Sequence, residues 1–216
     1  MDEYLGKILN TIVVEGIENN TIFIFTSDHG DILYSHGQVK KQQPYDESIL
    51  VPFLLRYTAL KEKSKGVIDI PINTQDILPT LLGLSDIDIP ETIEGKDFTK
   101  IIKGKEKVKD NSALIACITP FGQWPKSKGG MEYRGIRTKR YTYAKTLEGP
   151  WLLFDYKADP YQLRNLVSDP EYKQIISMLD KQLDQKLSET NDQFLSGNAY
   201  IKRWGYEVDE TGTISH

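Results

Sequence analysis

The sequence predicts an α/β fold in which a helix and an apolar strand are followed by a small antiparallel sheet and a C-terminal helix. Three observations carry this prediction. A helical stripe of apolar residues opens the chain, and a continuous β-branched and aromatic run follows at residues 21–26. Shorter strand-like segments then occupy residues 114–156, ahead of a long amphipathic segment.

The first predicted helix begins at once and has one apolar face. Gly16 is placed to end it. The start of the chain has neither a basic leader nor a small-residue cleavage site, so it does not read as a signal peptide. A helix that needs a partner layer opens the chain, so we expect the sequence to be the later part of a longer protein. The apolar face consists of residues at i, i+3, i+4, i+7 and i+8: Leu5, Ile8, Leu9, Ile12 and Val13.

The apolar run at residues 21–26 is typical of a strand buried on both faces, as in parallel sheets. A second strand is predicted at residues 51–57, with Pro52 at its entrance or on an edge. Residues 74–84 are apolar at helical spacing, and we expect Pro79 near the first turn or at a kink.

A Lys- and Gly-rich connection at residues 100–111 predicts a boundary. We expect residues 1–108 to form the end of the main α/β domain and residues 109–216 to form a C-terminal α+β subdomain. The second part should contain antiparallel strands and a last helix, and its polar tail from residue 191 should wrap the surface. The strands are predicted at residues 114–119, 133–144 and 151–156, and the helix after Asp169 and Pro170.

Composition narrows the class of protein. The 216 residues are 39% hydrophobic and 27% charged, which favours a packed core over disorder. The net charge of −4 argues against a nucleic-acid-binding surface, and no apolar run approaches the roughly 20 residues of a membrane span. A single cysteine, Cys117, allows no intrachain disulfide. Compartment and oligomeric state stay open.

Residues that can ligate a metal ion follow the predicted apolar strand directly. Asp28 and His29 come two and three residues after it, and Gly30 permits a tight turn beside them. Ligands of open α/β sheets bind at the carboxyl ends of strands, and both residue types are metal ligands. The alternative is a loop with a capping Asp and a surface His.

Residues 21–57 as a whole resemble the sulfatases of the alkaline phosphatase superfamily. Beyond Asp28 and His29 they contain Ser35-His36-Gly37, then Lys41 ahead of Tyr45 to Ser48, in the order and spacing of that family. Later segments are similar too, so the resemblance covers most of the chain. These segments are residues 74–82, 94–97, 134–143 and 153–166.

The resemblance implies the C-terminal part of an alkaline-phosphatase-like α/β sandwich. Asp28 and His29 then bind a divalent cation, usually calcium; because many members have Asn where His29 stands, magnesium, manganese and zinc stay open. Lys41 takes the place of the lysine that contacts a sulfate oxygen, with Lys40 as its neighbour. His36 either donates to the substrate or leaving group, or fixes the metal loop.

The family's nucleophile, a hydrated formylglycine made in a C-x-P/A-x-R motif, has no counterpart here. Thr119 and Phe121 replace the required residues after Cys117, which is predicted to be a buried, inert thiol. The family's first-strand Asp pair, which completes the metal site, is not seen either. We therefore expect the nucleophile in a missing N-terminal part and no turnover from this chain alone.

Nearby polar residues have structural interpretations. Tyr45, Asp46 and Glu47 are expected to stabilise the loop. Arg137 and Arg140 are expected to pair with the acidic residues around Asp155 and Asp159.

Two tryptophans have opposite interpretations. Trp124 lies in a Gly- and Pro-rich loop and is expected to line a substrate pocket. Trp151 is expected in the core.

Three functions follow from these patterns. The first is hydrolysis of a sulfate monoester on a sulfated small molecule or carbohydrate. The second is a phosphodiesterase or phosphonate ester hydrolase of the same superfamily. The third is a non-catalytic fragment or partner-binding remnant.

Overall fold

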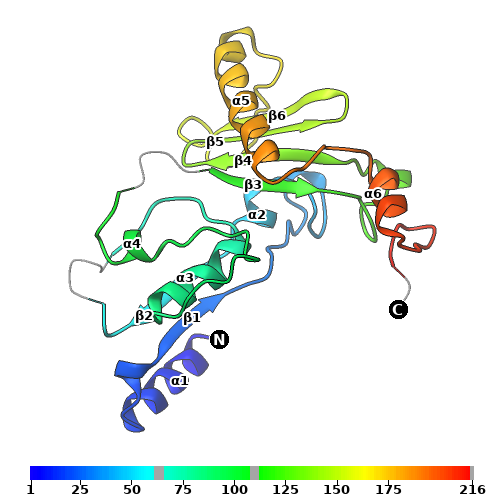
Figure 1. Ribbon diagram of the computed structural model, residues 1–216. Coiled ribbons are helices and arrows are strands. Elements are labelled where there is room, and N and C mark those ends of the chain that lie inside the picture. Colours follow the sequence, from blue (N-terminus) through cyan, green and yellow to red (C-terminus); the bar gives the residue numbers. More distant parts are fainter. Residues whose placement is uncertain (61–65, 108–111, 215–216) are drawn as a thin grey trace.

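The computed structural model describes residues 1–60, 66–107 and 112–214. In Figure 1, α1, β1, β2 and α3 lie at one end of the molecule, and a larger antiparallel sheet crossed by α5 lies at the other. The fold is mixed α/β, as predicted. Within the described part of the chain, no helix has the length and apolar character needed to span a membrane.

The first helix, α1 (Asp2–Val14), confirms the helical stripe. Gly16 follows it with a positive φ of 67°, a backbone conformation that glycine adopts without steric cost. None of the residues of α1 is buried within the described chain.

The strand β1 (Ile22–Thr26) pairs with β2 (Phe53–Tyr57), so that Ile24 stands opposite Leu55. The pairing is antiparallel, and four residues of β1 are half-buried while Thr26 is exposed. The expected burial on both faces of a parallel sheet is therefore wrong for the described chain, because one neighbouring strand alone pairs with β1.

The helix α3 (Ile77–Leu84) follows a 3₁₀ turn at Thr74–Asp76, and Pro79 lies buried in its first turn, where a missing N–H is tolerated. Asp76 fixes this turn, since its carboxylate accepts from the backbone N–H of Asn73 at 2.7 Å and of Lys96 at 2.8 Å. Two one-turn helices complete this part, α2 (Asp46–Ile49) and α4 (Thr99–Ile102).

A four-stranded antiparallel sheet in the order β3-β4-β5-β6 forms the larger part. Residues 133–144 make two strands rather than the single one predicted. The chain reverses at Lys139 and Arg140, where the Thr138 hydroxyl accepts from the backbone N–H of Tyr141 at 2.8 Å and closes the turn. The strands are β3 (Ser112–Cys117), β4 (Tyr133–Thr138), β5 (Tyr141–Thr146) and β6 (Gly149–Asp155).

Each face of this sheet has its own core. The helix α5 (Lys173–Glu189) packs across one face, where Leu183, Tyr143 and Leu153 have no exposed surface (Figure 1). The other face packs Trp124, Tyr133 and Phe154. As predicted, Asp169 caps the turn that leads into α5, and Pro170 follows it.

The tail does more than wrap the surface. It contains α6 (Gly197–Trp204), capped by the Ser196 hydroxyl, so the expectation that α5 is the last helix is wrong. The predicted boundary at residue 108 lies outside the described residues. Across that gap the Asn73 side chain holds the backbone of Leu114, donating at 2.7 Å and accepting at 2.9 Å.

Candidate active site

The candidate metal ligands, Asp28 and His29, follow β1 and are exposed to solvent. The Asp28 side chain is 82% exposed and that of His29 is 38% exposed. The backbone N–H of His29 donates to Asp28 Oδ1 at 2.9 Å, and this bond is the main reason why the pKa of Asp28 lies below its usual range. Asp28 is thus a carboxylate at neutral pH and available to a cation.

His29 has a defined tautomer. Its Nδ1 lies 2.7 Å from the carbonyl oxygen of Gly30, and because a carbonyl only accepts, Nδ1 carries the proton. The lone pair is therefore on Nε2, which faces Asp28 Oδ2 at 3.3 Å. This arrangement places the potential metal-binding nitrogen of His29 beside a carboxylate.

Lys41 joins this pair, although it is twelve residues further along the chain. Its ammonium contacts His29 Nε2 and donates to that lone pair. The structure thus brings Asp28, His29 and Lys41 together in one exposed cluster, which we call the Asp28–Lys41 cluster.

The donors fit a divalent cation in part. Asp28 Oδ2 and His29 Nε2, 3.3 Å apart, are close enough to ligate one ion at the usual distances of about 2.0–2.6 Å. Within the described ranges no third His, Cys, Asp or Glu joins them. Calcium takes six to eight oxygen ligands, so the cluster supplies only one edge of such a site.

The turn after His29 requires glycine. The Gly30 N–H donates to the Ser48 carbonyl at 2.9 Å, and a Cβ on Gly30 would lie 1.9 Å from the carbonyl oxygen of Glu47. Ile32, which is fully buried, donates its N–H to the Lys40 carbonyl at 2.7 Å. These contacts close the loop and bring Lys41 back to His29.

The closed loop has an unusual backbone. Non-glycine residues rarely adopt positive φ, and such conformations cost of order 1–3 kcal/mol each and cluster at functional sites. Two of these residues, Leu33 and Tyr34, are also strongly exposed. The five non-glycine residues with positive φ in this loop are Leu33, Tyr34, His36, Lys40 and Gln42.

His36 is part of the same loop, and its side chain is mostly buried. Its ring stacks on Tyr45 with centroids 4.0 Å apart and planes 9° from parallel, and its side chain is only 10% exposed. Its Nε2 is 3.4 Å from Glu47 Oε1 but not aligned for a hydrogen bond. Among the described residues, no hydrogen bond, ion pair or ring contact joins His36 to Asp28, His29 or Lys41. This geometry supports a role in holding the loop.

Asp46 anchors the loop to the C-terminal sheet. Arg137 donates to the Asp46 carboxylate from Nε at 3.1 Å and from a terminal nitrogen at 3.2 Å. The Tyr156 hydroxyl donates to the same carboxylate at 2.6 Å. The backbone N–H of Asp46 donates to Gln162 Oε1 at 2.7 Å. Burial is the main reason why the pKa of Tyr156 is raised, and the Asp46 carboxylate adds to it, so the phenol keeps its proton.

The predicted arginine pairings are half right. Arg140 pairs with Asp155 at 2.7 Å, as expected. Arg137 pairs with Asp46, 91 residues away, and not with Asp155 or Asp159. Spacing along one strand does not reveal such a distant partner.

The structure contradicts the expectation for Trp124 and confirms the one for Cys117. Trp124 is only 9% exposed and packs in the core beside Trp151, so its predicted place in a substrate pocket is wrong. Cys117 is buried as predicted, and burial raises the pKa of its thiol to about 12. Two exposed aromatic residues that the sequence patterns did not single out are Trp204 and Tyr206, whose close spacing in the tail was the available signal.

Comparison with known families gives one clear match. Residues 35–189 match the family model described as N-sulphoglucosamine sulphohydrolase, C-terminal. The matched segment includes His36 and Lys41 and begins after Asp28 and His29.

Individual relatives agree with that match. The chain is 45% identical over 95% of its length to a ulvan-active sulfatase of Formosa agariphila, of which it covers 40%. It is 32% identical over its full length to an arylsulfatase of Clostridium perfringens, of which it covers 43%. It therefore spans about two fifths of the length of these curated relatives.

A solved structure shares the fold. It has a TM-score of 0.77 and 25% identity, and the alignment covers 89% of this chain and 39% of that one. That protein was solved in complex with its substrate, D-glucosamine-2-N,6-O-disulfate.

Proposed function

This chain belongs to the N-sulphoglucosamine sulphohydrolase C-terminal family, and we propose that it is the C-terminal portion of a sulfatase that hydrolyses sulfate monoesters of carbohydrates. The observation that carries this proposal is the meeting of Asp28, His29 and Lys41 in one exposed cluster. A carboxylate, an imidazole lone pair and an ammonium suit a cation and an oxyanion side by side.

We propose that Asp28 and His29 ligate a divalent cation, with calcium first because Asp28 offers oxygen and with magnesium, manganese and zinc as alternatives. When bound, such an ion polarises a sulfuryl oxygen as a Lewis acid. The remaining ligands and the formylglycine nucleophile are assigned to the part of the protein that precedes this chain. Cys117 is not that nucleophile, since it is buried and its thiol keeps its proton.

The proposal assigns Lys41 to a sulfate oxygen. His29 Nε2 has one lone pair, so it can either accept a hydrogen bond from Lys41 or bind a cation, but not both. With that lone pair bound to a cation, the ammonium is free to face an anion. An ammonium 4 Å from a sulfate oxygen gains about 4 kcal/mol at an effective dielectric of 20, and it favours the transition state where charge accumulates on oxygen.

The other residues of the loop position this cluster. His36 stacks on Tyr45, and the next residue, Asp46, is held by Arg137 and Tyr156. The proposed role of His36 is therefore to hold the loop rather than to donate to the leaving group.

The cation is tested on the purified chain. Calorimetric titration with calcium, magnesium, manganese and zinc should show weak binding that falls in Asp28→Asn. The control is Asp2→Asn, which removes one carboxylate from the exposed first turn of α1. Equal affinities of the two variants would contradict the assignment of Asp28.

The reaction is tested on the longer protein that contains this chain. Lys41→Met should lower kcat/KM for a sulfated sugar by roughly a hundredfold to a thousandfold, the usual cost of one oxyanion donor. Lys40→Met is the matched control, and the isolated chain should show no turnover. An unchanged kcat/KM in Lys41→Met would remove Lys41 from the site.

The same assay separates the alternatives. Faster turnover of phosphonate monoesters or phosphodiesters than of sulfate esters would favour the phosphonate hydrolase function. Absence of turnover of any of these esters by the longer protein would favour a non-catalytic role.

A further inference from the structure

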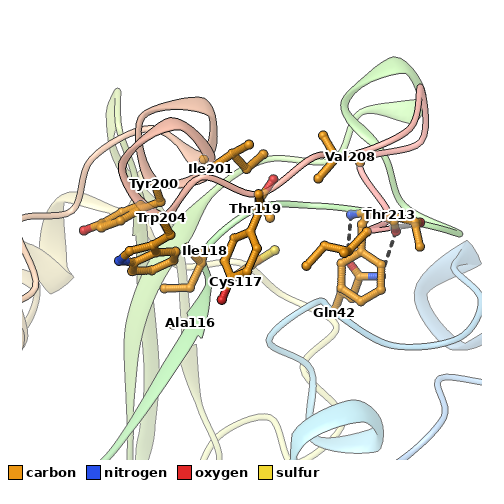
Figure 2. A pocket seen from close by; sticks show the side chains of 15 residues that line it. Gln42, Ala116, Cys117, Ile118, Thr119, Tyr200, Ile201, Trp204, Val208 and Thr213 are labelled. Carbon is orange, nitrogen blue, oxygen red and sulfur yellow. Dashed lines mark hydrogen bonds between the residues drawn. The ribbon is translucent and has the colours of Figure 1, made fainter. Parts of the chain in front are cut away.

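A cavity outside the Asp28–Lys41 cluster is lined in part by Gln42, the residue that follows Lys41. It has a volume of about 490 Å³, within the range of small-molecule sites, and it opens between the end of β3, the helix α6 and the tail. Figure 2 shows Tyr200 and Trp204 at one end, Gln42 and Thr213 at the other, and Cys117 and Thr119 between them. We call this cavity the Trp204 pocket.

Gln42 connects the pocket to the candidate active site. It follows Lys41 directly, so the two Cα atoms are about 3.8 Å apart. Its side-chain amide donates to the Phe121 carbonyl at 2.8 Å and accepts from the Phe121 N–H at 3.1 Å. One wall of the pocket is therefore fixed to the loop that carries Lys41.

The far end of the pocket is a rigid aromatic surface. Tyr200 is 6% exposed, its hydroxyl donates to Asp192 at 2.6 Å, and its ring stacks on Trp204 with centroids 4.9 Å apart. Tyr206 meets Trp204 edge-on at 6.1 Å. Yet Trp204 is 53% exposed and Tyr206 is 50% exposed, so a fixed indole and a phenol present open surface.

The lining also restricts the charge of the ligand. No Asp, Glu, Lys, Arg or His lines the described pocket, and its polar side chains are neutral ones such as Gln42, Thr119 and Thr213. A sulfated or carboxylated ring would lose hydration there without a charged partner. Aromatic faces with a few neutral hydrogen-bonding groups suit a ring that has an apolar face and hydroxyls at its edge.

We propose that the Trp204 pocket binds an uncharged pyranose ring of the saccharide substrate, next to the sulfated sugar held at Lys41. This rests on the proposed sulfatase function and adds a neutral subsite to it. The apolar C–H face of the ring lies on Trp204, and its hydroxyls reach the neutral polar side chains of the lining. The protein then acts on an oligosaccharide in which a sulfated residue is joined to an unsulfated one.

The first test measures binding apart from catalysis. The purified chain is titrated with the neutral disaccharides cellobiose, lactose and chitobiose. Binding is measured by calorimetry in every variant, and in the unaltered chain also by the indole NMR signal of Trp204. At least one of them should shift that signal, and Trp204→Ala should lose the binding while Trp204→Phe keeps part of it. Tyr4→Ala, which removes an exposed ring from α1, is the control. If none of the three shifts the signal, or if Trp204→Ala binds as well as the unaltered chain, the proposal is wrong.

The second test uses the longer protein that contains this chain. Trp204→Ala should raise KM for a sulfated disaccharide with a neutral second ring by roughly 3–10-fold, the value of one aromatic contact, with little change in kcat. KM for the sulfated monosaccharide should not change.

The outcomes separate the two proposals. Equal effects of Trp204→Ala on both substrates would overturn the subsite while leaving the sulfatase function intact. No turnover of either substrate would count against the sulfatase function, and the binding titration would still decide the subsite. If the chain binds the apolar probe 4-nitrophenol but none of the three sugars, the pocket takes an apolar ligand and not a pyranose, and the assignment is wrong.

Discussion

The two ends of the molecule have similarly apolar strands but very different burial. No residue of α1 is buried and β1 is at most half-buried, whereas Tyr143 and Leu153 of the larger sheet have no exposed surface. The candidate active site follows the weakly buried strand, and Arg137 and Tyr156 of the well-buried sheet hold its loop through Asp46. The candidate site and most of the buried core therefore lie in different regions of this chain.

The largest expected effect tests where stability resides. Leu183→Ala removes a fully buried side chain between α5 and the sheet and should destabilise the chain by about 2–5 kcal/mol. Ile8→Ala in α1, where the side chain is 49% exposed, should change stability by no more than about 0.5 kcal/mol. Urea denaturation measures both, and similar losses would show that α1 is as well packed as α5.

A second pair of variants tests the contact between the regions. Arg137→Met leaves the Asp46 carboxylate without its guanidinium partner and should cost about 1.5–3 kcal/mol. Arg164→Met removes an exposed pair with Asp169 and should cost at most about 1 kcal/mol. Hydrogen exchange should also become faster at the Ser48 and Ile49 amides in Arg137→Met alone. Unchanged exchange at those amides would argue against the anchoring role of Arg137.

Replacing Gly30 or Gly6 by alanine should change the stability of the chain in opposite directions. Gly30→Ala places a methyl group against the Glu47 carbonyl and should cost about 1–3 kcal/mol and weaken cation binding. Gly6 lies in α1, where a Cβ added to it would meet no atom within 4 Å outside the neighbouring backbone of the helix. Gly6→Ala should therefore stabilise the chain by about 0.5–1 kcal/mol through helix propensity. Thermal unfolding and calcium titration report both effects. A stabilising Gly30→Ala would show that the loop adapts freely.

The smallest effect is a dependence on pH confined to the larger sheet. Hydrogen bonds from Arg140 are the main reason why the pKa of Asp155 lies below its usual value. The folded state then binds fewer protons than the unfolded state, so this stability is present above about pH 4 and is lost as pH falls through the folded pKa. Asp155→Asn should therefore flatten the acid limb of the stability curve.

The partner variant provides the check for Asp155. Arg140→Gln should flatten the acid limb in the same way, because it removes the same hydrogen bonds. Denaturant melts between pH 3 and pH 7 measure both variants. An acid limb as steep as that of the unaltered chain, in either variant, would show that another group controls it.

Local patterns were sufficient for most elements. The stripe from Leu5 to Val13, the apolar run before Asp28 and the cap at Asp169 each predicted an element that the structure contains. Such signals depend on neighbouring residues and on the 3.6-residue and 2-residue periods of helices and strands. The turn at Lys139 and Arg140 was missed because no glycine or proline marks it.

The sequence alone was sufficient to indicate the family and the mixed α/β fold, and it singled out Asp28, His29 and Lys41 as candidates, because these inferences depend on residue types in a fixed order. The folded chain was needed to show that Lys41 contacts His29, that Arg137 pairs with Asp46 from 91 residues away and that Trp204 is exposed while Trp124 is buried. The physical reason is that burial and long-range pairing are set by which surfaces the folded chain brings together. No local period encodes that choice.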